Sequence, residues 1–222
     1  MGFDLINDWH RVKRIKNKIK LFEKKWIYDW SINEDNASIM FEAIKLIKPT
    51  IVIETGTFEG HGTLLIASAI NELNKKATIY TIDYPNDPLT KLDKKKWLDL
   101  DKIRKNNLNK IRNKFDDIKI VYLEGDSRIV LPKLLFESQI KWDLFFQDSM
   151  HFYEGILSEW NAIKSYANSR AIAIFDDISL SKKEFEQNGI KFCQWFSSSK
   201  DALKWNYLST EIGHHQFWVQ RK

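Results

Sequence analysis

The sequence predicts an α/β fold built on a seven-stranded, doubly wound sheet that is mostly parallel and ends in an antiparallel hairpin. Three observations lead to this prediction. Short apolar runs alternate with helix-length segments over most of the chain. The runs lack a polar face, as is typical of parallel strands covered by helices on both sides. The last two strand-like runs are joined by a loop too short for a crossover helix, so they should pair antiparallel.

Five β/α units precede the hairpin. The predicted parallel strands span residues 51–54, 78–83, 118–123, 142–147 and 171–175, and the hairpin strands span 203–209 and 216–220. The predicted helices span residues 33–48, 62–73, 94–113, 127–136, 153–166 and 190–197. Strands alternating with helices in this way indicate a Rossmann-like arrangement.

We expect one folded domain over residues 33–222, because the chain contains no repeat and no low-complexity linker. Residues 1–32 are predicted to form a basic helical extension. Within it, residues 9–27 have apolar side chains near helical spacing with Lys and Arg between them. This helix is expected either to pack on the periphery of the domain or to act as a basic lid over an anionic substrate.

Composition excludes several classes of protein. The 35 basic and 30 acidic residues give a net charge of +5, but the two signs are interspersed, which is typical of a solvated surface and not of a nucleic-acid interface. The one cysteine, Cys193, rules out an internal disulfide and favours a reducing compartment. No apolar run reaches the length of a membrane span or resembles a secretory core. We therefore expect a cytoplasmic protein without a nucleic-acid or membrane partner.

An acidic residue stands at or just after each of the five predicted parallel strands. These acids are Glu54, Asp83, Asp126, Asp148 and the pair Asp176 and Asp177. Ligands of open α/β sheets bind beyond the carboxyl ends of the strands. A single acid at such a place is often a helix cap, but acids at all five strand ends predict a binding site.

The turn after the first strand, ETGTFEG at residues 54–60, lacks the G-x-G-x-x-G pattern that binds a dinucleotide pyrophosphate. It suits a small zwitterion instead. Gly56 permits a tight turn, Thr57 and backbone N–H groups can bind a carboxylate, and Glu54 can bind an ammonium group. An ordinary strand-to-helix connection is the alternative interpretation.

The next two strand ends suit a nucleoside. Asp83 is placed to accept hydrogen bonds from a ribose diol, and Tyr84 to pack either on an adenine or within its loop. Asp126 and Ser127 can accept from and donate to the adenine edge, and Ser127 can alternatively cap the following helix.

Five segments of the chain resemble class I S-adenosylmethionine-dependent methyltransferases: VIETGTFEGHGT, YTIDYP, LEGDSRIVLPKL, WDLFFQDSMHFYEGILSEW and AIAIFDDI. More narrowly, they are similar to metal-dependent O-methyltransferases that act on macrolide sugars and related small molecules. The resemblance spans residues 36–222. It implies S-adenosylmethionine as the methyl donor and adds cofactor contacts at Gly60, Thr63 and Asp148.

The resemblance also implies Mg²⁺ or another divalent cation held by Asp148, Asp176 and Asp177. Independently, three converging carboxylates repel one another unless a hard cation neutralises them; capping of a helix by the Asp176–Asp177 pair is the alternative. His151 matches the position of the general base, with Asp148 as another candidate, although a loop hydrogen bond would also explain this histidine. The chain has Ser149 where the family often has glycine, and this change bears on the placement of His151.

The function predicted from the sequence is methyl transfer to a hydroxyl group of a small molecule or glycan. A metal-independent methyltransferase of the same fold, a non-catalytic cofactor-binding module and a nucleotide-dependent oxidoreductase are the alternatives. The acceptor and the oligomeric state, a homo-oligomer included, stay open. The resemblance implies that the N-terminal segment and the loop at residues 179–189 select the acceptor.

Overall fold

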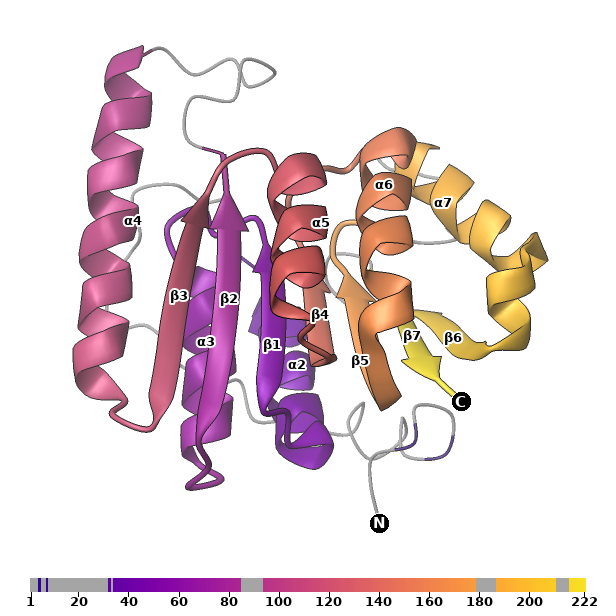
Figure 1. Ribbon diagram of the computed structural model, residues 1–222, viewed down its shortest axis with the longest axis horizontal. Helices are drawn as coiled ribbons and strands as arrows, with labels where there is room; N and C mark the ends of the chain where they lie inside the picture. Colours follow the sequence, from indigo (N-terminus) through magenta and orange to yellow (C-terminus); the bar gives the residue numbers. More distant parts are fainter. Residues whose placement is uncertain are drawn as a thin grey trace.

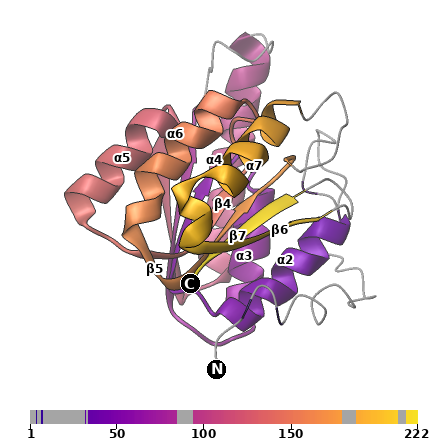
Figure 2. The ribbon, with the colours of Figure 1, turned by 90° about the vertical axis from the view of Figure 1, so that its right-hand side faces the viewer.

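A computed structural model of the 222-residue chain describes residues 4, 7, 32, 34–84, 94–178, 187–210 and 216–222. The basic helix predicted at residues 9–27 lies outside the described residues, as do nearly all of the predicted extension at 1–32 and the loop residues 179–186. Within the described part, a seven-stranded sheet is covered by helices on both faces (Figures 1 and 2). None of the helices described has both the length and the apolar character needed to cross a membrane.

The predicted doubly wound sheet is confirmed, with a C-terminal antiparallel hairpin. The strands are β1 (Ile51–Thr55), β2 (Ala77–Asp83), β3 (Ile118–Glu124), β4 (Trp142–Gln147), β5 (Ala167–Phe175), β6 (Trp205–Thr210) and β7 (Gln216–Arg221). The α-helices are α2 (Glu34–Ile47), α3 (His61–Asn71), α4 (Lys94–Lys114), α5 (Ser127–Ser138), α6 (Tyr153–Ile163) and α7 (Gln187–Ser198). The order is β3-β2-β1-β4-β5-β7-β6, with β1 to β5 parallel and β7 antiparallel to both of its neighbours.

The central strands carry apolar residues on both of their faces because each face of the sheet is buried. On β4, Leu144 and Phe146 belong to the core that includes side chains of α2, α3 and α4. Phe145, between them, belongs to the opposite core, formed with α5, α6 and α7. Figure 2 shows α5, α6 and α7 on one side of the sheet and α2 and α3 on the other. Alternate side chains of one strand thus fill two separate cores.

The second strand of the hairpin, β7, lies inside the sheet, and β6 forms the edge. Phe217, Trp218 and Val219 of β7 are fully buried, whereas the middle of β6 is only half-buried. A strand whose consecutive side chains are all apolar needs cover on both faces. This burial pattern explains why β7 pairs with β5.

Several predicted boundaries differ from the structure. The strand predicted at 171–175 begins at Ala167, and the helix predicted at 190–197 begins at Gln187. The helix predicted at 153–166 ends as an α-helix at Ile163 and continues as a 3₁₀ turn over Lys164–Tyr166. The strand predicted at 203–209 begins at Trp205, because Lys200–Leu203 forms a 3₁₀ turn whose first residues are capped by the Ser199 side chain. These differences leave the carboxyl edge of the parallel strands, where the predicted site lies, unchanged.

Candidate active site

Backbone hydrogen bonds join the loops beyond the parallel strands. They run from Gly56 N–H to the Ile82 carbonyl (2.9 Å), from Asp148 N–H to the Thr55 carbonyl (2.8 Å) and from Asp176 N–H to the Gln147 carbonyl (2.9 Å). Each bond ties one loop to the strand beside it. The loops after β1, β4 and β5 therefore form one continuous edge, as a ligand site of an open α/β sheet requires.

Glu54 is a fully buried acid near the end of β1. Thr63 Oγ1 donates a hydrogen bond to its Oε2 at 2.5 Å. Its Oε1 is buried and finds no hydrogen-bond partner among the residues that the structure describes. Burial raises the pKa of Glu54 to about 7. Gly62 leaves room for the carboxylate, because a Cβ there would overlap Oε1. A buried carboxylate oxygen without a partner suits a cationic group of a ligand.

The turn after β1 depends on two glycines for different reasons. Gly56 has a φ of 91°, and a Cβ at this position would overlap the carbonyl oxygen of Asp148, so the turn touches the loop after β4. Gly60 has a φ of 94° and precedes α3 as its N-cap, but a Cβ there would make only ordinary van der Waals contacts, the nearest at 3.7 Å. The Thr57 hydroxyl lies 2.5 Å from the Thr81 hydroxyl in the core. The Thr57 hydroxyl therefore has a partner within the protein.

Asp83, at the end of β2, is held by its neighbours. Its Oδ2 accepts a hydrogen bond from Phe58 N–H (2.6 Å), and its Oδ1 accepts one from Tyr84 N–H (2.7 Å). The buried guanidinium of Arg104 lies 3.1 Å from Oδ2. Burial raises the pKa of Asp83, and the Arg104 charge opposes that shift. The rigid carboxylate retains lone pairs for a diol, and the Tyr84 ring is 39% exposed beside it.

Asp126 and Ser127, after β3, have different surroundings. Asp126 caps α5 by accepting a hydrogen bond from Arg128 N–H (2.9 Å), and the Arg128 guanidinium also contacts its carboxylate. This side-chain contact lowers the pKa of Asp126. Ser127, the first residue of α5, is buried. The cap is therefore Asp126, and Ser127 points toward the interior.

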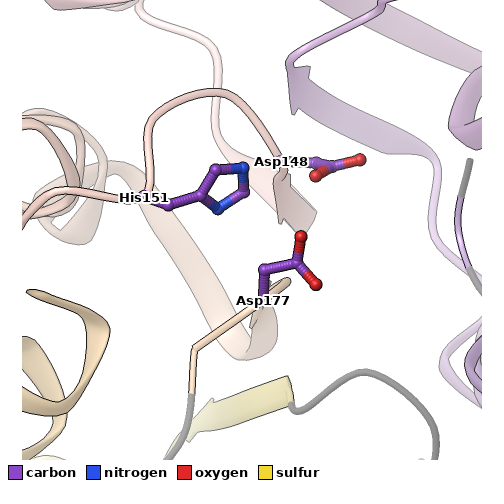
Figure 3. A group of neighbouring side chains, drawn as sticks. All are labelled: Asp148, His151 and Asp177. Carbon is purple, nitrogen blue, oxygen red and sulfur yellow. The ribbon is translucent and has the colours of Figure 1, made fainter. Parts of the chain in front are cut away.

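Asp148, His151 and Asp177 come together at the ends of β4 and β5 (Figure 3). One potential ligand atom from each lies within 4.8 Å of the other two. Loss of solvation, followed by the charges of Asp176 and Asp177, raises the pKa of Asp148 well above its usual value. Asp177 has a left-handed φ of 56°, a conformation that Asp tolerates better than most residues.

Asp176 faces a different environment from Asp177. Its Oδ1 accepts a hydrogen bond from Gln216 Nε2 (2.7 Å) and a longer one from Asn36 Nδ2 (3.5 Å), and the residue is 3% exposed. Among the described residues, the group that could hold a metal ion consists of Asp148, His151 and Asp177, and does not include Asp176. The assignment of Asp148, Asp176 and Asp177 as metal ligands stays a prediction.

The loop that carries His151 is fixed by two polar contacts. Gln147 Nε2 donates to the Met150 carbonyl at 2.7 Å, and the Ser149 hydroxyl donates to Glu159 at 2.7 Å. Ser149, the departure from the family's common glycine, therefore has a buried partner. Burial lowers the pKa of His151, and the Asp177 charge opposes this.

Glu54→Gln should make stability less sensitive to pH. The folded-state pKa of Glu54 is raised from 4.5 to about 7, so this group favours folding below pH 4.5 and loses that contribution as the pH rises to 7. Over this window the wild type should lose about 3 kcal/mol of unfolding free energy that the variant retains. Urea unfolding across the window measures the difference. Glu124→Gln, at an exposed glutamate, is the control, and parallel pH curves for Glu54→Gln and wild type would contradict the assignment.

The sheet order, the glycine turn after β1 and the acids along the carboxyl edge define a class I S-adenosylmethionine-dependent methyltransferase. Sequence comparison agrees, because residues 53–178, more than half of the chain, match the family model described as a methyltransferase domain. The chain belongs to this methyltransferase-domain family. Among curated proteins, none matches the sequence.

Solved structures share the fold at low sequence identity. The methyltransferase PaMTH1 of Podospora anserina, bound to S-adenosylhomocysteine, has a TM-score of 0.67 at 16% identity, covering 100% of this chain and 90% of its own. The O-methyltransferase TomG of Streptomyces achromogenes, in complex with S-adenosylmethionine, has a TM-score of 0.66 at 13% identity over 87% and 82%. An O-methyltransferase of Bacillus cereus with S-adenosylhomocysteine has a TM-score of 0.63 at 14% identity over 88% and 84%.

Sequence reasoning missed two buried charges that contact the predicted site. Arg104 is fully buried on α4 and donates to the Phe58 carbonyl at 2.7 Å. Glu159 is fully buried on α6. A signal was present, because Glu159 lies at helical spacing from Ile156 and Ile163, on the apolar face of its helix. A charge in such a stripe indicates a buried polar contact.

Proposed function

We propose that the protein is an S-adenosylmethionine-dependent O-methyltransferase that acts on a hydroxyl group of a small molecule with the help of a divalent cation. The observation that carries the proposal is the group of Asp148, His151 and Asp177 directly beside the glycine turn after β1. A methyl donor in that turn would lie next to a cluster able to bind and deprotonate an acceptor. The O-methyltransferases among the similar structures support the same reaction class.

The donor would be held by groups at the ends of β1 and β2. The buried Oε1 of Glu54 would receive its ammonium group, and N–H groups of the turn after Gly56 would receive its carboxylate. Asp83, fixed by Arg104, would receive the ribose hydroxyls. Tyr84, which is partly exposed, would pack against the adenine.

The cation would be held by Asp148 and Asp177, whose oxygen ligands suit Mg²⁺. When bound, it supplies positive charge that makes an acceptor hydroxyl more acidic. His151 would take the hydroxyl proton, because its ring lies beside the two acids that would hold the cation, and so beside the place where the acceptor hydroxyl would bind. Asp176, held by Gln216, is proposed as the third acid of the set. The chain contributes mainly orientation, which is worth several kcal/mol in such transfers.

Binding and turnover assays test the proposal in order. Calorimetry should detect one S-adenosylhomocysteine site per chain and no binding of NAD. Radiolabelled S-adenosylmethionine, offered with a panel of sugar and other hydroxyl acceptors, should transfer its methyl group in the presence of Mg²⁺. A chelator should stop the transfer, and added Mg²⁺ should restore it.

Each outcome excludes a different part of the proposal. A wild-type protein that fails to bind S-adenosylhomocysteine is not a methyltransferase. Turnover that continues unchanged in a chelator would assign the chain to metal-independent transfer. Cofactor binding without a methylated product across the panel would favour a non-catalytic binding module.

A further inference from the structure

Glu159 is a buried acid that the proposed mechanism does not use. It lies on the core-facing side of α6, where Ile156, Trp160 and Ile163 are, like Glu159 itself, fully buried. Burial of a carboxylate is unfavourable unless the protein supplies hydrogen bonds to it. The position therefore calls for partners from the neighbouring loops.

Two hydroxyl groups supply those bonds. Ser149 Oγ donates to Glu159 Oε1 at 2.7 Å, and Thr55 Oγ1 donates to Oε2 at 3.1 Å. Burial raises the pKa of Glu159 to about 7, while hydrogen bonds from neighbouring hydroxyl groups oppose the shift. Both oxygens of the carboxylate are thus engaged by residues outside α6.

The two hydroxyls belong to two different segments of the site. Thr55 is the last residue of β1 and directly precedes Gly56 of the glycine turn. Ser149 follows Asp148 in the loop after β4. One carboxylate consequently joins the start of the turn after β1 to the loop that carries an acid of the proposed metal group.

We propose that Glu159 is a positioning residue that holds the Asp148 loop at a fixed place relative to the cofactor-binding turn after β1. This inference rests on the proposed function.

The experiment uses full-length protein and two separate probes. S-adenosylhomocysteine binding is measured by calorimetry, and Mn²⁺ binding is measured by electron paramagnetic resonance with S-adenosylhomocysteine at saturation. The variants are Glu159→Gln, Thr55→Val, which keeps the side-chain shape without the hydroxyl, and Ser149→Ala. Glu137→Gln, the same change at an exposed glutamate of α5, is the matched control.

The inference predicts that the variants differ in which of the two ligands they weaken. Glu159→Gln should weaken both S-adenosylhomocysteine and Mn²⁺ by about tenfold, the effect typical of losing a group that orients ligand residues. Thr55→Val should weaken mainly S-adenosylhomocysteine, and Ser149→Ala mainly Mn²⁺. Glu137→Gln should bind both as the wild type does. If these residues were needed only for folding, their replacement would lower the melting temperature without this difference between S-adenosylhomocysteine and Mn²⁺ binding.

The outcomes distinguish this inference from the proposed function. No S-adenosylhomocysteine binding by the wild type would overturn the proposed function and the inference with it. Wild-type binding of both probes, with unchanged dissociation constants in Glu159→Gln, would overturn the inference alone. If Glu159→Gln fails to fold, Thr55→Val and Ser149→Ala still decide, because equal effects of each on both probes would refute the positioning role.

Discussion

Gly56→Ala should remove nearly all S-adenosylhomocysteine binding. The new methyl group would overlap the Asp148 carbonyl oxygen, and the residue would have to keep a φ of 91°. The turn after β1 and the loop after β4 would move apart, and a displacement of about 1 Å at such a site can cost about 100-fold. We expect at least this loss of affinity by calorimetry, together with a lower free energy of unfolding in urea.

Gly60→Ala is the matched control for the same chemical change. Gly60 has nearly the same φ, 94°, but the nearest atom to an added Cβ would be 3.7 Å away. This variant therefore carries only the strain of a left-handed alanine, about 1–2 kcal/mol, and no steric overlap. Equal losses of affinity in the two variants would show that backbone strain, and not contact with the Asp148 loop, makes Gly56 necessary.

Asp148→Asn should abolish cation binding and at the same time stabilise the cation-free protein. Burial and the nearby charges of Asp176 and Asp177 raise the pKa of Asp148 well above its usual value, so its ionised form is unfavourable in the fold. The neutral amide should raise the free energy of unfolding by about 1 kcal/mol. Mn²⁺ affinity should fall by more than about 100-fold, because loss of an outer-shell group alone costs 10–100-fold.

Asp143→Asn, on the same strand, should have the opposite effect on stability. Asp143 lies near the other end of β4, where it accepts hydrogen bonds from Thr50, Ile51 and Asn168. Replacing this charged acceptor should cost about 1–2 kcal/mol without changing Mn²⁺ binding. Thermal unfolding and Mn²⁺ titration of both variants measure the contrast. A melting temperature that falls in Asp148→Asn would contradict unfavourable burial of its charge.

The sequence alone determined the sheet and the edge that carries the site. Apolar runs such as residues 142–147 need cover on both faces, and this requirement is local enough to be visible in the order of residues. The short connection before Gln216 likewise predicted an antiparallel hairpin. Parallel strands place their carboxyl ends at one edge of the sheet. The acids at or after the ends of β1 to β5 could therefore be predicted from the sequence to share one site.

Only the tertiary structure decided which partner each polar side chain meets. Arg104 and Glu159 interrupt the apolar faces of their helices, but the order of residues does not state that they bind Asp83 and Ser149. The same holds for Asp176, which Gln216 reaches from β7 because that strand inserts beside β5. Periodicity specifies which side of an element is buried, whereas hydrogen-bond partners depend on how distant segments are brought together when the cores pack.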